Sequence, residues 1–364
     1  FAYKISVMTA DQKEYIQVRI SMVFNVVKVL LQIVLLIWLK SYGIYLVLSL
    51  IATVGSNIVA SIKAEKEYPY IKEKRGLEKE KKRDIFDTIR SVFLYKISNV
   101  ILTGTDNTLI SALVGTVYVG YYSNYFLLEN SLYVIMKIVF RSTTASVGNL
   151  VVTEDAKTRY RVFDYMQTIS FCMCAVVIPC YFVLVDDFIS HVWLGKGFGI
   201  GLFALIGLCL NFYITSVFLP VISFREAIGL YRKTKYYMLA AALLNVGLSA
   251  IFSIKWGMAG ILLATPIARL LTYVWYEPKI LFEEYFEKGA GQFIVQCIKN
   301  VFLVTGISWL CYIIGTHILV SGIIGWILKG CLCGSLSLII TICAYRKTEG
   351  FQWLVGQAKK GLNM

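Results

Sequence analysis

The stretch ISMVFNVVKVLLQIVLLIWL, residues 20–39, holds a single charged side chain, Lys28, among its 20 residues. A helix needs about 20 mostly apolar residues to cross the hydrocarbon core of a bilayer, so this stretch predicts a transmembrane helix. Ten such windows lie along the chain, at residues 20–39, 43–62, 91–114, 117–140, 162–185, 200–222, 236–254, 257–276, 294–315 and 321–344. The sequence therefore predicts an all-α polytopic membrane protein with about ten transmembrane helices, because strands of a membrane barrel would be shorter and alternating.

The composition of the whole chain agrees with this prediction. Of the 364 residues, 58% are hydrophobic and 16% are charged. A soluble domain carries about 25% charged residues and has too little interior for so much apolar surface, which excludes a soluble enzyme, a secreted scaffold and a disordered linker.

Two histidines leave almost no material for a metal site, and all nine cysteines fall in expected spans, where they serve as small packing residues. We expect no metal and no cofactor.

The positions of the lysines and arginines predict the orientation in the membrane. The segments expected on one side of the membrane hold 27 Lys and Arg residues, and the loops expected on the other side hold three. The 27 lie in segments 1–19, 63–90, 141–161, 223–235, 277–293 and 345–364. Loops rich in Lys and Arg stay in the cytoplasm, so we expect a multi-pass protein of the cell membrane with both termini cytoplasmic. This distribution accounts for the net charge of +14 without a nucleic acid partner.

Several ionisable side chains lie inside the expected spans. A charge at mid-membrane costs roughly 2.5–3.5 kcal/mol on insertion scales, so it usually faces water or a partner. Two spans carry polar stripes at helical spacing, namely Lys96, Asn99, Thr103 and Asp106 on one and Tyr125, Glu129, Tyr133 and Lys137 on the next. Lys28 and Arg269 lie on shorter polar stripes of two other spans. We expect these faces to surround a shared hydrated cavity; the alternative is that the charges pair across helices and lock the bundle.

The run GTDNTLISALVGTVYVGYYSNYFLL, residues 104–128, contains an Asp within one expected helix, then a Gly, then a stretch with aromatic residues at the start of the next expected helix. Asp106, Gly115 and the sequence VGYYS at 119–123 occupy these positions. This pattern resembles the seventh and eighth helices of the bacterial polysaccharide flippases. These are the O-antigen and capsule repeat-unit transporters of the multidrug, oligosaccharidyl-lipid and polysaccharide exporter superfamily. The specific motif covers 25 residues, and the similarity in hydropathy extends over the whole chain.

The resemblance implies a two-lobe, MATE-like fold of fourteen helices, of which the ten here are the fifth to the fourteenth. Four helices would then precede Phe1, so we expect an N-terminally truncated chain. The implied parts are two helices that end the N-terminal lobe, a charged cytoplasmic connector, a six-helix C-terminal lobe, and a final helix pair with a cytoplasmic tail. Their boundaries are 1–62, 63–90, 91–276 and 277–364.

The resemblance also implies a function. The family translocates polyprenyl-pyrophosphate-linked oligosaccharide repeat units across the bacterial cytoplasmic membrane by alternating access, for surface polysaccharide biosynthesis. The implied substrate-binding candidates are Lys28, Lys96, Asn99, Tyr125 and Arg269, and the ion-coupling candidates are Asp106 and Glu129. The implied partners are the lipid-linked oligosaccharide, the lipid bilayer, and a polysaccharide polymerase or glycosyltransferases. The protein itself would not be an enzyme.

Three other functions stay open at this point. A multidrug cation exporter of the same superfamily would favour acidic cavity residues, whereas the expected spans hold more Lys and Arg than Asp and Glu. A lipid II-type flippase is a close relative that the sequence does not distinguish. A membrane polysaccharide polymerase would need reactive groups near the outer face, where the candidates are Asp186, Asp187 and His191, but the expected outer loops are short.

Overall fold

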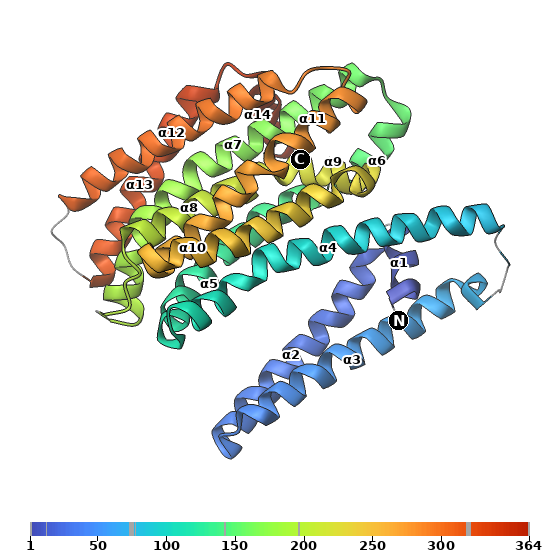
Figure 1. Cartoon of the computed structure of the whole chain (residues 1–364), viewed down its shortest axis with the longest axis horizontal. Coiled ribbons are helices and arrows are strands. Elements are labelled where there is room, and N and C mark those ends of the chain that lie inside the picture. The colour runs from blue at the N-terminus through green and yellow to red at the C-terminus, as the bar shows by residue number, and fades with distance from the viewer. Residues whose placement is uncertain are drawn as a thin grey trace. The chain divides into compact units, whose positions relative to one another are not determined.

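A computed structural model of the chain describes residues 2–11, 13–72, 76, 78–141, 143–195, 197–317 and 322–362. Within these ranges every regular element is a helix (Figure 1). Six helices are long and apolar enough to cross a membrane, and the pair α8–α9, bent by 44°, could form a seventh. The prediction of an all-α fold is thus confirmed and is compatible with a polytopic membrane protein, whereas the count of ten spans stays a prediction.

The chain forms two compact units, residues 1–82 and residues 83–364. In the first unit, α2 (Glu14–Leu39) and α3 (Tyr42–Glu67) form an antiparallel hairpin, with α1 (Ala2–Ala10) and the short 3-10 helix η1 (Pro69–Lys72) packed on α3. Gln32 joins the two long helices by donating to the carbonyl of Tyr45 at 2.9 Å and to the hydroxyl of Ser49 at 2.8 Å. The outer faces of this hairpin are mostly large apolar side chains, as expected where lipid surrounds a helix pair.

The second unit holds the remaining helices, and α4 begins just before its boundary. They are α4 (Lys79–Leu113), α5 (Thr116–Arg141), α6 (Thr144–Thr153), α7 (Ala156–Asp187), the π-helix η2 (Phe188–Trp193), α8 (Leu202–Val217), α9 (Leu219–Ile228), α10 (Tyr231–Leu271), α11 (Tyr273–Tyr285), α12 (Gly291–Thr316), α13 (Gly322–Tyr345) and α14 (Glu349–Leu362).

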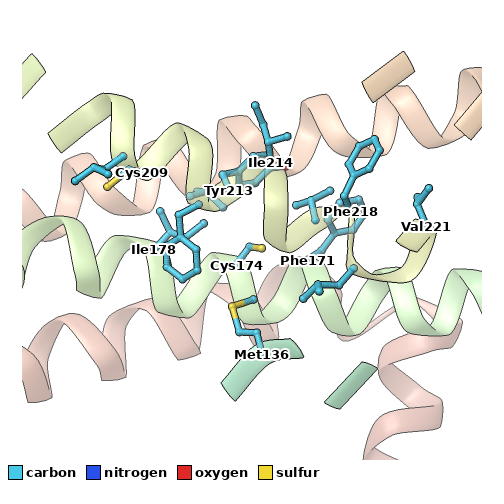
Figure 2. Packing of buried hydrophobic residues seen from close by; sticks show 14 of the residues in the cluster. Met136, Phe171, Cys174, Ile178, Cys209, Tyr213, Ile214, Phe218 and Val221 are labelled. Atoms are coloured by element: carbon cyan, nitrogen blue, oxygen red, sulfur yellow. The ribbon is translucent and has the colours of Figure 1, made fainter. Parts of the chain in front are cut away.

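Helix α7 occupies the middle of this unit. It packs against α5, α8, α9, α12, α13 and α14. Figure 2 shows how Phe171, Cys174 and Ile178 of α7 lie among buried side chains that include Tyr213 of α8 and Met136 of α5. At its start, the carboxylate of Asp155 accepts a hydrogen bond from the backbone N–H of Thr158 at 3.0 Å, which satisfies one of the free donors of the first turn. Helix α7 is therefore the central helix of the second unit, around which the other helices pack.

Helix α10 consists of two helical arms that meet at Gly257, where the chain reverses direction. The backbone there has φ 53° and ψ −132°, a combination that glycine adopts readily and that residues with a Cβ atom rarely adopt. Asn245 and Thr265 would lie about 30 Å apart in a straight helix. Instead, the Asn245 amide donates to the Thr265 hydroxyl at 2.7 Å. The two arms of this hairpin correspond to the expected spans 236–254 and 257–276.

Two of the expected spans are less apolar than the others. The expected spans 91–114 and 117–140 lie in α4 and α5, which are not among the six strongly apolar helices, because each carries a polar face. Within the expected connector 63–90, α3 ends at Glu67 and α4 begins at Lys79. The expected boundary at 277 lies inside α11, and the division between the compact units falls within 63–90.

Candidate functional site

The second unit contains a polar cavity of about 530 Å³, hereafter the polar cavity, bordered by α4, α5, α8, α9, α10 and α11. Its ionisable lining residues are Lys96, Lys137, Arg225, Arg269, Asp106, Glu129 and Glu226. Its amide and tyrosine side chains are Asn99, Asn130, Asn211, Tyr95, Tyr122, Tyr133, Tyr231 and Tyr273. Polar groups within an apolar bundle are costly unless they meet partners or water, so a lining of this kind is suited to water or a polar ligand.

The structure brings most of the predicted site residues together here. Lys96, Asn99 and Asp106 line the cavity from α4, Glu129 lines it from α5, and Arg269 lines it from the second arm of α10. The stripes predicted from helical spacing account for this, because Thr103, Tyr133 and Lys137 face the same space. Lys96 and Lys137 are exposed, whereas Asp106, Glu129 and Arg269 are buried.

The buried part of the cavity holds two carboxylates and one guanidinium. Asp106, 6% exposed, accepts a hydrogen bond from the hydroxyl of Thr265 at 3.2 Å, and Thr265 in turn accepts from Asn245. Glu129 is 4% exposed, and its Oε2 has no hydrogen-bond partner among the described residues. Arg269 is also 4% exposed and donates from Nη1 to the hydroxyl of Tyr273 at 2.5 Å, while its Nε has no partner in the same part of the chain. This region therefore offers both a cation and an acid for a ligand.

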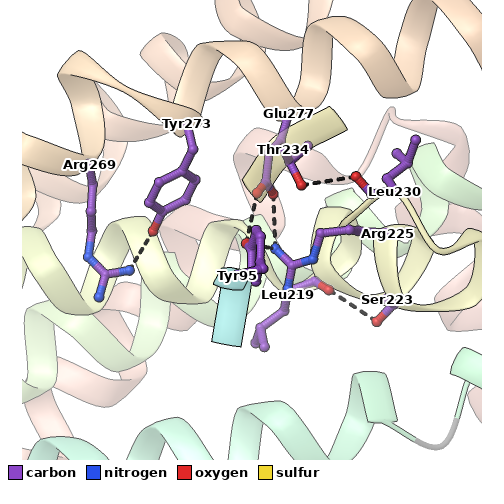
Figure 3. A network of polar contacts seen from close by, with 9 residues as sticks. All are labelled: Tyr95, Leu219, Ser223, Arg225, Leu230, Thr234, Arg269, Tyr273 and Glu277. Carbon is purple, nitrogen blue, oxygen red and sulfur yellow. Dashed lines mark hydrogen bonds and ion pairs between the residues drawn. The ribbon is translucent and has the colours of Figure 1, made fainter. Parts of the chain in front are cut away.

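A buried ion pair lies at the other end of the cavity (Figure 3). Arg225 of α9 donates from Nη1 to Glu277 of α11 at 2.9 Å, and the hydroxyl of Tyr95 on α4 donates to the same carboxylate at 2.7 Å. Arg225 also donates to the Tyr95 hydroxyl, and its guanidinium lies 4.5 Å from the centre of the Tyr95 ring. The network thus ties α9 and α11 to α4.

Sequence reasoning missed this network. It placed Arg225 in the loop 223–235 and Glu277 at the start of the loop 277–293, where charged side chains are expected to be solvated. The structure instead bends the expected span 200–222 by 44° between α8 and α9, so α9 carries Arg225 back into the bundle. The available signal was Pro220, which is well placed at the beginning of a new helix and poorly placed within one.

Of the two remaining predicted binding residues, Lys28 belongs to the first unit and Tyr125 lies in the second unit away from the lining of the polar cavity. Lys28 lies on α2 in the first unit, where it is half-buried and donates to the side chain of Asn25 at 3.0 Å. Tyr125 is fully buried in the core; its hydroxyl bonds to the carboxylate of Asp186, and its carbonyl accepts from Tyr181 at 3.0 Å. The polar stripe on α5 thus separates into a cavity face and a packing face.

The candidates considered for an outer catalytic site lie elsewhere in the second unit and are engaged with neighbours. Asp187 forms an ion pair with Lys329 of α13 at 2.6 Å, and Nδ1 of His191 lies 3.7 Å from the other oxygen of the same carboxylate. Asp186 bonds to Tyr125. These contacts join α7 and η2 to α5 and α13, and none of the three candidates lines the polar cavity.

The described residues contain no group of three or more His, Cys, Asp or Glu side chains that could hold a metal ion. The cysteines in these ranges are free thiols, mostly packed inside or between helices. No family model, curated protein or solved structure matches the chain. The polar cavity is therefore the feature on which a functional proposal rests.

Proposed function

We propose that this chain belongs to a flippase that moves polyprenyl-pyrophosphate-linked oligosaccharide repeat units across the bacterial cytoplasmic membrane, with both termini in the cytoplasm. The observation that carries the proposal is the polar cavity. It lies in a unit with several helices apolar enough to cross a membrane, and six helices contribute cations, acids, amides and tyrosines to it. The resemblance of residues 104–128 to polysaccharide flippases supports the same function, since Asp106 of that motif faces the cavity.

A cavity of this kind addresses the physical difficulty of the substrate. The sugar head and the pyrophosphate carry many polar groups, and each one left without a hydrogen bond in hydrocarbon costs several kcal/mol. The prenyl chain, by contrast, is soluble in lipid. A hydrated cavity that opens alternately to the two sides of the membrane lets the head cross without leaving a polar environment.

Cationic side chains of the cavity would bind the pyrophosphate. Arg269 is the strongest candidate because it is buried and its Nε points to no partner among the described residues. Guanidinium groups bind phosphate oxygens through paired N–H donors, which fits a residue with unused donors. Lys96 and Lys137 are exposed along the same cavity and would receive the anion on entry. Lys28 of the first unit stays a predicted contributor.

The uncharged polar residues would bind the sugars. Asn99, Asn130 and Asn211 come from three different helices and each offers both donors and an acceptor. Tyr122 and Tyr133 add aromatic surfaces beside them. Sugar hydroxyls both donate and accept hydrogen bonds, so a lining of amides and phenols suits a carbohydrate head better than a purely charged lining.

Asp106 and Glu129 would couple transport to a cation or a proton. Both carboxylates are buried, and Glu129 keeps one oxygen without a hydrogen-bond partner in the described part of the chain. An ionised carboxylate in such a place is costly unless a cation binds it, and the alternative is to take up a proton. Either event changes the charge of the cavity, which can bias it toward one of two open states.

The test is surface polysaccharide in a strain whose own copy of the gene is replaced by variants. Glu129→Gln, Arg269→Gln and Lys28→Ala should each reduce surface polysaccharide by at least about tenfold, the effect of losing roughly 1.4 kcal/mol of binding. The amount of protein in the membrane should be unchanged. Matched controls are Glu283→Gln and Arg346→Gln, which remove the same charges from exposed positions outside the cavity. Normal polysaccharide in Glu129→Gln, Arg269→Gln and Lys28→Ala alike would contradict the proposal.

The buried carboxylates give one specific reason to test a second function, export of cationic drugs. A cation exporter would use Asp106 and Glu129 to bind its substrate directly. In that case Glu129→Gln would abolish efflux of a cationic dye such as ethidium and leave surface polysaccharide intact. The opposite pattern supports the flippase.

A further inference from the structure

Helix α14 follows α13 after a link of three residues, 346–348, and α13 is long and apolar enough to cross a membrane. The link is a tight turn. The hydroxyl of Thr348 donates to the carbonyl of Tyr345 at 2.8 Å, and the backbone N–H of Phe351 donates to the Thr348 hydroxyl at 3.4 Å. Tyr345 is in turn tied to α12, because its hydroxyl accepts a hydrogen bond from the Asn300 amide at 2.8 Å. The start of α14 is therefore held beside the bundle.

Helix α14 crosses α7 at close range. At Gly350, an added Cβ atom would lie 2.6 Å from the hydroxyl oxygen of Thr168 and 3.2 Å from the Cα atom of Tyr165. Almost one turn later, the ring of Trp353 stacks on the ring of Tyr165, with 5.4 Å between the ring centres. Because no side chain at position 350 separates the two helices, α14 is held at the level of Tyr165 and Thr168 along α7.

The charges of α7 indicate where that level lies in a bilayer. Four charged side chains lie in the first nine residues of α7, and the last of them is Asp164. The next 21 residues, 165–185, contain no charged side chain. As a helix this run is about 32 Å long, close to the thickness of the hydrocarbon core. Tyr165 therefore marks one edge of the hydrocarbon, and α14 crosses α7 at the level of the lipid headgroups.

The side chains of α14 differ from one side of the helix to another. Successive residues turn by about 100°, so Gly350 and Trp353 share the side toward α7, whereas Phe351 and Val355 lie together on a different side. Phe351 is half-buried and Val355 is 38% exposed. We call these two residues the apolar strip. Among the described helices, α7 is the main neighbour of α14, so the strip is only partly covered by protein.

Basic side chains accompany the apolar strip. Residues 346–362 include four Lys and Arg residues and one acid. Arg346, Lys347 and Lys359 are exposed, and Lys359 follows Val355 by about one helical turn. A helix that combines an apolar strip with basic residues is suited to lie in the plane of a membrane surface, where the strip enters the acyl boundary and the cations meet the headgroups. Stacked Trp and Tyr rings are also suited to this level.

We infer that α14 lies on the membrane surface and binds anionic phospholipid. Phe351 and Val355 contact the first carbons of the acyl chains, and Lys359 contacts the phosphates beside them. The level of α14 favours lipid over a protein partner, because a side chain that points outward at the edge of the hydrocarbon meets lipid first. The excess of basic residues favours anionic lipid, since each Lys or Arg near an anionic surface strengthens binding about fivefold.

The experiment uses the purified full chain in nanodiscs of phosphatidylcholine with a small share of a phosphatidylglycerol that carries a diazirine near its headgroup. After irradiation, mass spectrometry should find lipid on peptides of α14. Val355→Glu places a carboxylate in the apolar strip and should reduce this labelling by at least about fivefold. The matched control, Gln357→Glu, adds the same charge at an exposed position about 160° away around the helix and should leave labelling within about twofold of wild type.

Lys359→Gln tests the preference for anionic lipid. It should lower the ratio of phosphatidylglycerol labelling to labelling by a matched phosphatidylcholine probe by about fivefold. Labelling by the phosphatidylcholine probe itself should persist, which shows that the helix is still in place. Equal labelling of the wild-type protein by the two lipids would overturn the inference, and so would equal effects of Val355→Glu and Gln357→Glu. A protein labelled on α13 but not on α14 would place α14 away from the membrane and contradict it as well.

Discussion

Arg225 and Arg269 are both buried beside the polar cavity, but they differ in what surrounds their charge. Arg225 has a carboxylate partner in Glu277 at 2.9 Å and a ring beneath it in Tyr95. Arg269 makes a hydrogen bond to the neutral hydroxyl of Tyr273, and no ion pair joins it to an acid in the described ranges. Removal of one partner from a buried ion pair leaves an uncompensated charge and destabilises a protein, whereas a buried cation without an acid partner has donors left for an anionic ligand. The proposed function accordingly gives the first arginine a role in stability and the second a role in binding.

Glu277→Gln tests the assignment of Arg225. The substitution keeps the size of the side chain but leaves the guanidinium buried without its counter-charge. Removal of one partner from a buried pair costs about 3–5 kcal/mol. The unfolding temperature of the purified protein in detergent should therefore fall by roughly 5–10 °C, as a thermal-shift assay would measure.

The control is Glu284→Gln on the same helix. Glu284 pairs with Lys233 at 2.5 Å, but both side chains are more than one third exposed. Exposed pairs contribute less than about 1 kcal/mol, so this variant should unfold close to the wild-type temperature. Equal shifts in the two variants would mean that Arg225 does not depend on its buried partner.

Helical spacing predicted which polar side chains share one face of a single helix, but it did not predict which part of that face lines the cavity. Spacing placed Lys96, Asn99 and Asp106 on one face of α4, and the structure has all three on the cavity. Spacing alone did not separate Glu129 from Tyr125, which lies four residues earlier, because the width of a cavity face depends on neighbouring helices. Tyr125 faces α7 instead, where Asp186 and Tyr181 satisfy its polar atoms.

At the scale of elements, turns and breaks were harder to predict than apolar runs. The runs 162–185 and 294–315 each lie within one apolar helix, and residues 322–344 of the run 321–344 lie within another, because length and hydropathy are local properties. Pro220 is a local signal that a new helix can begin there. The direction that α9 takes, packed against α5, α6, α7 and α11, is not reported by any local pattern. The polar faces of α4 and α5 lower their hydropathy, and the same residues line the polar cavity.

The hairpin in α10 provides a test at this scale. Gly260 lies three residues after the reversal, and a methyl group there would lie 2.5 Å from the carbonyl carbon of Phe252 on the first arm. Backbone cannot move aside as a flexible side chain can, so Gly260→Ala should force the arms apart and destabilise the protein by about 1–3 kcal/mol. A lower unfolding temperature and weaker binding of a sugar pyrophosphate should follow, since Thr265 and Arg269 lie on the displaced arm.

Gly247→Ala is the matched control within the same helix. Nothing lies within 4 Å of the added methyl group at that position. Alanine is favoured over glycine inside a helix by up to about 1 kcal/mol, so this variant should be as stable as the wild type or slightly more stable. A loss of stability as large as that of Gly260→Ala would show that close approach at the reversal is not the cause.

At the scale of the molecule, contacts in the second unit gather the basic segments at one end. Arg232, at the start of α10, forms an ion pair with Asp84 of α4 at 2.5 Å. Lys288, just before α12, lies 3.8 Å from the centre of the ring of Tyr160 near the start of α7. The tail helix α14 stacks Trp353 on Tyr165, also near the start of α7. These segments lie far apart in sequence, and the charge count had assigned all of them to one side of the membrane.

This convergence makes the orientation testable. The end of α7 that carries the basic contacts should lie in the cytoplasm, and the other end, with Asp187 and Lys329 paired, should face outward. Alkaline phosphatase is active only outside the cytoplasm, so insertion of the enzyme after Gly199 should give activity and fusion after Met364 should not. A fluorescent protein fused after Met364 should show the opposite behaviour. Active phosphatase after Met364 would place most of the basic residues outside the cytoplasm. The oligosaccharide of the proposed function is made in the cytoplasm and exported, so the polar cavity would then face the wrong side of the membrane to take it up.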